Sequence, residues 1–145
     1  MSVENDGGGT LLIDANRVTN AGSDGIQVAN FGGSGSSWLA VVVANNVIDG
    51  HSRNPAAAFL GGVVVFGFDG STCLALHGNS VSGTAAGYDG VYLEEAGGAF
   101  TYEEVPNSAA SGTVTPAYVL SGNSVGSASV NGAVALSNGV ACQRP

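Results

Sequence analysis

The sequence predicts an all-β protein, a β-solenoid of about four coils in which equivalent strands stack in parallel. Two observations lead to this fold class: four apolar segments repeat, each with an asparagine at the same place, and 24 glycines among 145 residues supply turns. No stretch keeps a 3.6-residue apolar period free of glycine and β-branched residues, which argues against helices. A β-sandwich with coincident Gly-Asn turns is the alternative.

The first repeated segment is a strand, a corner and a short return strand. Apolar residues stand five and three positions before each asparagine and two positions after it, the alternation typical of strands. Its copies are LLIDANRVTN at 11–20, VVVANNVIDG at 41–50, LALHGNSVSG at 74–83 and YVLSGNSVGS at 118–127. We expect their asparagines to form an internal ladder, since an amide can bond both the turn backbone and the next coil; they are Asn16, Asn46, Asn79 and Asn123.

A second strand follows in every coil. Asp-Gly or Asn-Gly turns lead into a short apolar strand, with a Gly-Gly pair as the weakest copy. The copies are DGIQV at 24–28, GGVVV at 61–65, DGVYL at 89–93 and NGAVAL at 131–136. Two strands per repeat, separated by turns at a period near 30 residues, are typical of a solenoid coil.

This pattern resembles the right-handed parallel β-helix repeats of the pectin-lyase-like superfamily, from Thr10 to Val140. More narrowly, CLALHGNSVSG at 73–83, DGVYLEEAGGAFTYEE at 89–104 and GVACQRP at 139–145 resemble the C-terminal end of large secreted bacterial surface or adhesin-type β-helix proteins. The resemblance implies a right-handed parallel β-helix in a secreted or cell-surface protein. It implies no single activity, because that fold carries lyases, hydrolases, adhesins and tail spikes.

We expect one domain at 10–145, preceded by a polar lead-in at 1–9 and carrying a long inserted loop at about 94–115. No capping helix is predicted at either end. The N-terminal edge near Thr10 is therefore expected to continue into further coils or to stack on another chain. The first residues lack the features of a signal peptide, and we interpret the chain as a part of a larger protein.

The charge argues against two classes of partner. Eleven acidic residues, three arginines and no lysine give a net charge of −8. Nucleic acids and anionic membranes both require basic groups, and no apolar run reaches the roughly 20 residues that span a bilayer. We expect no cofactor; calcium and neutral glycans are compatible with this composition.

The two cysteines, Cys73 and Cys142, are disulfide candidates, with two free thiols as the alternative. Two rungs of a solenoid are about 9.6 Å apart, beyond the roughly 7 Å Cα limit for a disulfide. The tail must therefore fold back by about one rung if the bond forms. Neither cysteine has a histidine and an acid at a spacing typical of catalysis.

The best candidate for a ligand site is the stretch at 88–104, which combines acids with aromatic rings. Carboxylates beside aromatic platforms suit glycans, and clustered carboxylates suit calcium. The alternative is that these acids are solvated turn residues; glycoside hydrolysis by paired carboxylates is the least favoured interpretation. The candidates are Asp89, Tyr92, Glu94, Glu95, Tyr102, Glu103 and Glu104. We assign no catalytic residue and no metal ligand from the sequence.

One column of apolar residues, four positions before each ladder asparagine, is expected to face outward. An exposed apolar stripe is usually covered, here by the insertion at 84–115 or by a partner or second copy. These interface candidates are Leu12, Val42, Ala75 and Val119.

These observations predict a non-enzymatic structural or adhesive module of a secreted or surface protein, able to assemble with itself or with neighbouring coils. The alternative is a carbohydrate-active module that binds or cleaves glycans through 88–104. No arginine stands where a lyase base is expected, and four coils make a short cleft, which favours the structural interpretation.

Overall fold

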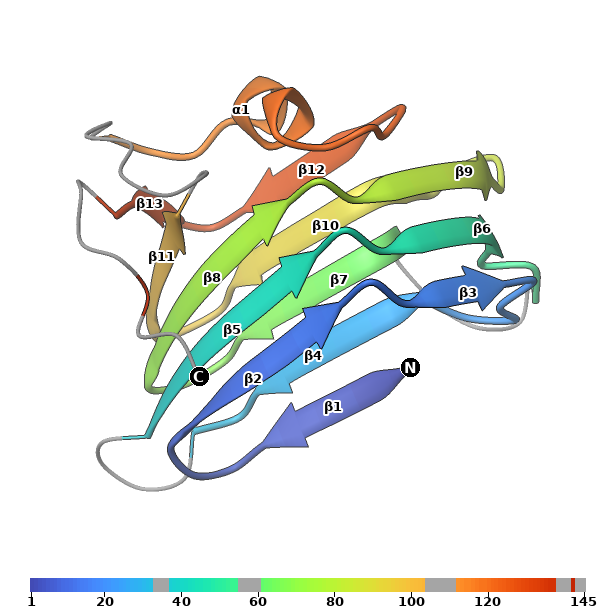
Figure 1. Ribbon diagram of the computed structural model, residues 1–145. Helices are drawn as coiled ribbons and strands as arrows, with labels where there is room; N and C mark the ends of the chain where they lie inside the picture. Colours follow the sequence, from blue (N-terminus) through green and yellow to red (C-terminus); the bar gives the residue numbers. More distant parts are fainter. Residues whose placement is uncertain (33–36, 55–60, 104–111, 138–141, 143–145) are drawn as a thin grey trace.

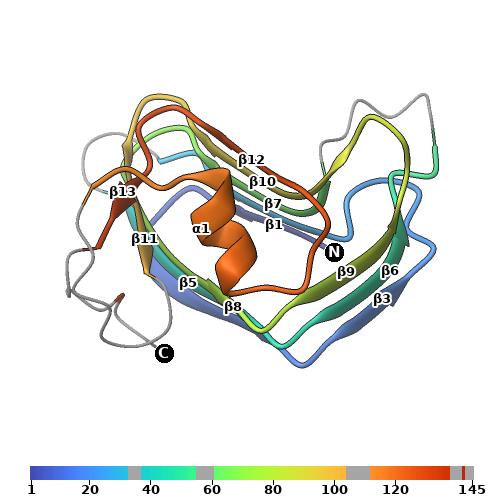
Figure 2. The same cartoon turned by 90° about the horizontal axis from the view of Figure 1, so that it is seen from above.

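A computed structural model describes residues 1–32, 37–54, 61–103, 112–137 and 142, and shows a parallel β-solenoid of about four turns (Figure 1). The predicted fold class is confirmed. Seen along the stack, three sheets enclose a common core (Figure 2).

Successive coils contribute strands to three sheets in turn, and after β9 the described strands belong to sheets A and B. Sheet A contains, in order, β1 (Ser2–Asn5), β4 (Ile26–Asn30), β7 (Gly61–Gly67), β10 (Asp89–Glu95) and β12 (Ala128–Asn131). Sheet B contains β2 (Gly9–Asp14), β5 (Trp38–Ala44), β8 (Ser71–His77), β11 (Ala99–Glu103) and β13 (Ala135–Leu136). Sheet C contains β3 (Arg17–Thr19), β6 (Val47–His51) and β9 (Ser80–Thr84).

The core consists of inward columns that the alternation in the sequence creates. In sheet B, Ile13 pairs with Val43 and Val43 with Leu76. In sheet A, Val28 pairs with Val65 and Val65 with Leu93, and all of these side chains are buried. Each fully buried aliphatic side chain stabilises the fold by about 1.5–3 kcal/mol.

The asparagine ladder crosses all four coils at the corner between sheets B and C. The Nδ2 groups of Asn16, Asn46 and Asn79 each donate to the Oδ1 of the next asparagine, at 3.0, 2.9 and 2.9 Å. The three backbone N–H groups donate to the same oxygens. The left-handed residue of each corner is the one before the asparagine, namely Ala15, Asn45 and Gly78, with φ of 55°, 55° and 66°.

The structure differs from the predicted lead-in at 1–9 and from the predicted inserted loop at about 94–115. The expected lead-in contains β1, which pairs with β4, and the expected loop from residue 94 begins inside β10 and includes β11. The NGAVAL segment is not the fourth sheet A strand. The strand that follows β10 in sheet A is β12, the fifth of that sheet, and β13 within NGAVAL pairs with β11 in sheet B.

The prediction that the fourth copy of the first segment begins with a strand is also wrong, because residues 116–121 form helix α1 (Pro116–Ser121). Thr115 is its N-cap and Pro116 its first residue, both favourable at a helix start. Val119 is fully buried in the core, and the Tyr102 and Tyr118 rings meet edge to face at 6.0 Å. In both views α1 lies across the end of the stack (Figures 1 and 2). The expectation of no capping helix is therefore wrong at this end.

Candidate functional site

The predicted ligand residues are divided between two sheets. Asp89, Tyr92, Glu94 and Glu95 belong to β10 in sheet A, whereas Tyr102 and Glu103 belong to β11 in sheet B. The segment is thus not one loop, and its carboxylates do not converge on one point. Glu104 lies outside the described residues.

Tyr92 is the centre of a polar cluster on the outer face of sheet A. Its hydroxyl donates to Glu94 Oε2 at 3.1 Å and accepts from Asn131 Nδ2 at 2.6 Å, and Ser129 Oγ donates to Asp89 Oδ2 at 2.6 Å. Burial raises the pKa of the Tyr92 hydroxyl; Glu94 and Asp89 add to the rise, and the Asn131 amide opposes it. The cluster satisfies its own hydrogen bonds across two coils, as a structural network does.

The other predicted residues have structural contacts. Glu95 accepts hydrogen bonds from the backbone N–H groups of Ala133 and Gly97, which lower the pKa of its carboxyl. Tyr102 is fully buried and donates to the Leu76 carbonyl at 2.9 Å. Glu103 is 3% exposed and accepts from the backbone N–H of Cys142 at 3.0 Å. Glu95 therefore stabilises turns, Tyr102 stabilises the core, and Glu103 holds Cys142 in place.

A stripe of aromatic rings on the outer face of sheet A was not predicted from the sequence. Phe31 stacks on Phe68 with ring centroids 5.0 Å apart, Phe68 stacks on Phe66 at 5.2 Å, and Phe66 meets Tyr92 at 6.1 Å. The alternation in VVVFGF at 63–68 places both of its phenylalanines on one face. That pattern could have revealed part of the stripe, but Phe31 joins it only through the pairing of coils.

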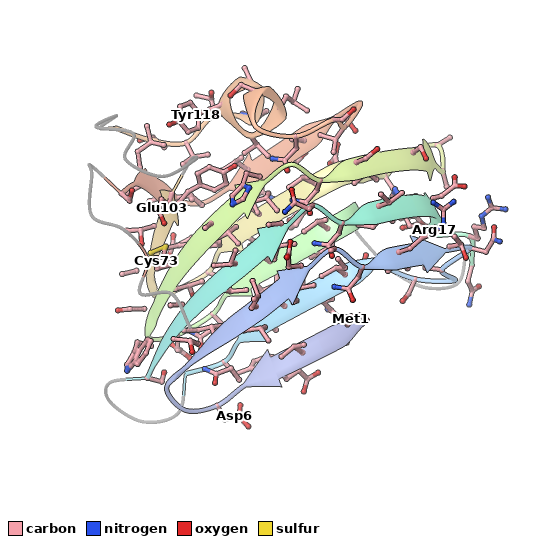
Figure 3. The ribbon with its side chains drawn as sticks, viewed as in Figure 1. Met1, Asp6, Arg17, Cys73, Glu103 and Tyr118 are labelled. Carbon is pink, nitrogen blue, oxygen red and sulfur yellow. A yellow bond between two sulfur atoms is a disulfide. The ribbon has the colours of Figure 1, made fainter. Side chains whose placement is uncertain are left out.

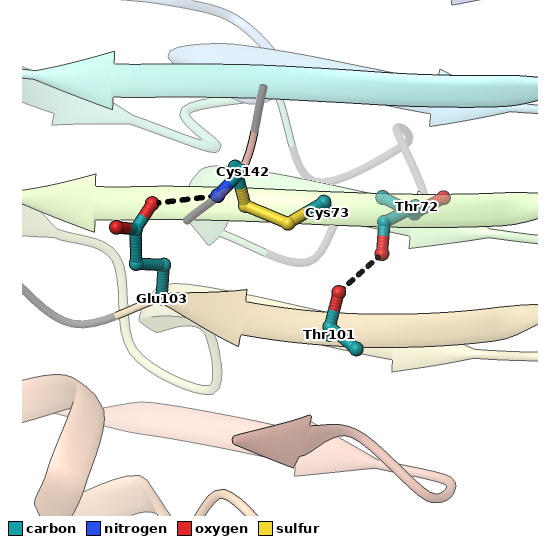
Figure 4. Close-up of a disulfide and its surroundings, with 5 residues drawn as sticks. All are labelled: Thr72, Cys73, Thr101, Glu103 and Cys142. Carbon is teal, nitrogen blue, oxygen red and sulfur yellow. Dashed lines mark hydrogen bonds between the residues drawn. A yellow bond between two sulfur atoms is a disulfide. The ribbon is translucent and has the colours of Figure 1, made fainter. Parts of the chain in front are cut away.

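Cys73 and Cys142 form a disulfide, with Cα atoms 5.5 Å apart. Cys142 is not in a rung of the stack but lies against the outer face of sheet B, beside β8 and β11 (Figures 3 and 4). The distance between rungs, which seemed to oppose the bond, therefore does not apply. The hydrogen bond from Cys142 to Glu103 fixes the tail a second time.

The four interface candidates do not form one exposed stripe. Leu12 is 56% exposed, but Val42 and Ala75 are buried against each other and Ala44. Val119 belongs to α1 and faces the core, because the fourth copy is helical. Only the Leu12 end of the expected column is open.

The two ends of the solenoid differ in how the hydrogen bonds of the asparagine ladder end. At one end, β1, β2 and β3 are the outermost strands of their sheets, and Asn16 Oδ1 accepts no hydrogen bond from any described residue. At the other end, Asn123 Nδ2 donates to the Val119 carbonyl of α1 at 3.0 Å and to Leu76 at 3.3 Å. The ladder is open at Asn16 and closed by the helix at Asn123.

His51 is a fully buried residue whose setting was not predicted. Its Nδ1 lies 3.0 Å from Ser52 Oγ and its Nε2 lies 3.1 Å from Thr84 Oγ1. Burial lowers the pKa of His51, and nearby Asp24 partly opposes this. The neutral imidazole is held between two hydroxyls, an arrangement that stabilises the corner after β6.

Across the described residues, no three His, Cys, Asp or Glu side chains gather where they could hold a metal ion, and no helix could cross a membrane. Comparisons of the chain with protein-family models, curated proteins and solved structures give no match. The structure shows the solenoid fold, whereas the superfamily resemblance stays an interpretation of the repeat pattern.

Proposed function

We propose that this chain is a non-enzymatic structural module that closes one end of a longer β-solenoid in a secreted or cell-surface protein of adhesin type. The contrast between the two ends supports this function. Helix α1 covers the core and closes the ladder at one end, whereas β1, β2 and β3 leave unpaired backbone groups at the other. Terminal repeats of solenoids carry such caps on one side only.

The open end has the geometry that another coil requires. Leu11 and Val18 are only partly buried there, and the oxygen of Asn16 points out of the ladder with no donor among the described residues. A parallel coil with an asparagine at the same place would donate to that oxygen and cover both side chains. The disulfide supports a secreted or surface location, because such bonds persist in oxidising compartments.

A tandem duplication of residues 9–38 tests the proposal. Gly9 pairs with Leu39, so a second copy joins in register and its asparagine meets the original one. We expect a monomer with a higher urea midpoint and a larger m-value, because more surface is buried. The control carries a Gly/Ser segment of equal length at the same point. A duplication no more stable than this control would contradict the proposal.

Self-association through the same edge is checked by light scattering during size-exclusion chromatography. If two copies meet at the edge, Leu12→Asp returns the mass to that of one chain, 14.2 kDa. Ala86→Asp adds the same charge at an exposed turn and is the matched control. If the unsubstituted protein is already a monomer, the edge does not bind a second copy of this chain, and the proposed partner of the edge is a coil of another segment.

A second candidate function, glycan binding, is favoured by the aromatic stripe beside the Tyr92 cluster. Phe31 is 41% exposed and Tyr92 lies among amide and carboxylate groups, a combination suited to sugar rings. Phe31→Ala and Tyr92→Ala should each reduce retention on a glycan array, and Tyr88→Ala should not. Equal retention of all variants would exclude this surface.

A further inference from the structure

A pocket of about 250 Å³ lies on the outer face of sheet B, where β5, β8 and β11 begin. Three strands form its floor. Trp38 of β5 pairs with Ser71 of β8, which pairs with Ala99 of β11. Because Ser71 and Ala99 are small, a hollow remains beside the large indole.

Cys142 supplies one wall of this pocket together with Cys73. Cys142 is held there by the disulfide and by the hydrogen bond from its backbone N–H to Glu103 (Figure 4). Trp38 supplies the opposite wall. Its indole passes so close to Gly8 that a Cβ there would stand 3.0 Å from Nε1. The indole thus contacts Gly8 while remaining 41% exposed, and the disulfide holds the other wall before any ligand arrives, which lowers the entropic cost of binding.

The lining selects against charged ligands. Its side chains are the indole, alanine, serine, threonine and leucine residues and the disulfide, whose cysteines do not titrate. An ion placed there would lose its hydration without a partner. Aromatic rings, in contrast, gain from contact with indole and with sulfur.

The polar groups of the lining are few. The hydroxyl of Thr101 donates to the Thr72 carbonyl at 3.3 Å, while the hydroxyl of Ser71, an exposed residue, takes part in no hydrogen bond with another described residue. A sugar ring would bring several hydroxyls to a lining in which Ser71 is the one hydroxyl donor outside the hydrogen bonds of the described residues, and buried hydroxyls without partners are costly. A ring with a single hydrogen-bonding group fits this supply.

We propose that this pocket, which we name the Trp38 pocket, binds a neutral aromatic ring that carries one hydrogen-bonding group, as in a phenol. An apolar cavity of about 150 Å³ holds benzene, and drug-sized ligands need at least about 300 Å³. The Trp38 pocket lies between these sizes. The ring would lie between the indole and the disulfide with its hydroxyl at Ser71. This site is independent of the end-module function.

Phenol is the probe for the test, and the protein's one tryptophan makes NMR a clean readout. We expect saturable shifts of the Trp38 indole N–H signal and of the Ser71 and Ala99 amides, with a Kd on the order of 1 mM. Ala99→Leu fills the pocket from an exposed position and should weaken binding at least fivefold. Ala86→Leu, at an exposed turn, should leave it unchanged.

Ser71→Leu gives an independent filling variant if Ala99→Leu unfolds. Shifts that do not saturate, or that persist in both filling variants, would overturn the pocket. Saturable shifts with glucose instead of phenol would overturn the ligand class.

Discussion

Single asparagines carry much of the specificity of this solenoid. Asn46 is fully buried, its Oδ1 accepts two hydrogen bonds from Asn16, and its own N–H groups donate to Asn79 and Ile13. Asn46→Ala should therefore lower the free energy of unfolding by about 3 kcal/mol. Asn16→Ala, at the open end, should cost about 1 kcal/mol because the Asn16 backbone bond to Asn46 survives. Urea denaturation measures both, and equal losses would contradict the ladder.

His51 gives the stability of the fold a pH dependence. Burial lowers its pKa in the folded state below the 6.5 of an unfolded chain, so the unfolded state binds more protons as the pH falls. Stability from His51 is full above pH 6.5 and declines as the pH falls below that value. His51→Gln should make the urea midpoint less dependent on pH between pH 7 and pH 5.5. An unchanged slope would show that other groups are responsible.

At the scale of elements, helix α1 is the part that sequence patterns concealed. Tyr118–Leu120 alternates like the earlier strands, yet it is β13 that pairs with β11, and Thr115-Pro116 favours a helix start. The same limit hid the functional surfaces. The inward columns follow from alternation within one strand, whereas the aromatic stripe and the Trp38 pocket depend on which residues of different coils become neighbours.

The cap itself can be tested by a charge on either side of α1. Val119→Asp places a carboxylate in the core and should release the helix, with fast hydrogen exchange in α1 and association of the uncovered ends. Ala117→Asp changes the exposed side of the same helix and should leave exchange and mass unaltered. Slow exchange of α1 in the Val119→Asp protein would show that the helix does not depend on core contact.

For the whole molecule, the disulfide joins the tail to the third coil across a sequence separation of 69 residues. Chain-entropy arguments assign such a closure up to about 4 kcal/mol. Cys73→Ala with Cys142→Ala should lower the urea midpoint accordingly, while the far-ultraviolet circular dichroism stays that of the solenoid. A loss of the β spectrum would mean that the coils need the bond to form.

The asparagine ladder also has an electrical consequence. Its amide oxygens all point toward the β2 edge, and each of Asn16, Asn46 and Asn79 gives one hydrogen to the next asparagine in the direction of α1. The second hydrogens of Asn46 and Asn79 go to carbonyl groups of the preceding coil. Aligned amide dipoles add, as they do along a helix, so the column carries a partial negative charge at Asn16. Hydrogen bonds in such a chain polarise one another, and each added coil strengthens those already present. A longer stack would thus bind its next coil more tightly than a shorter one.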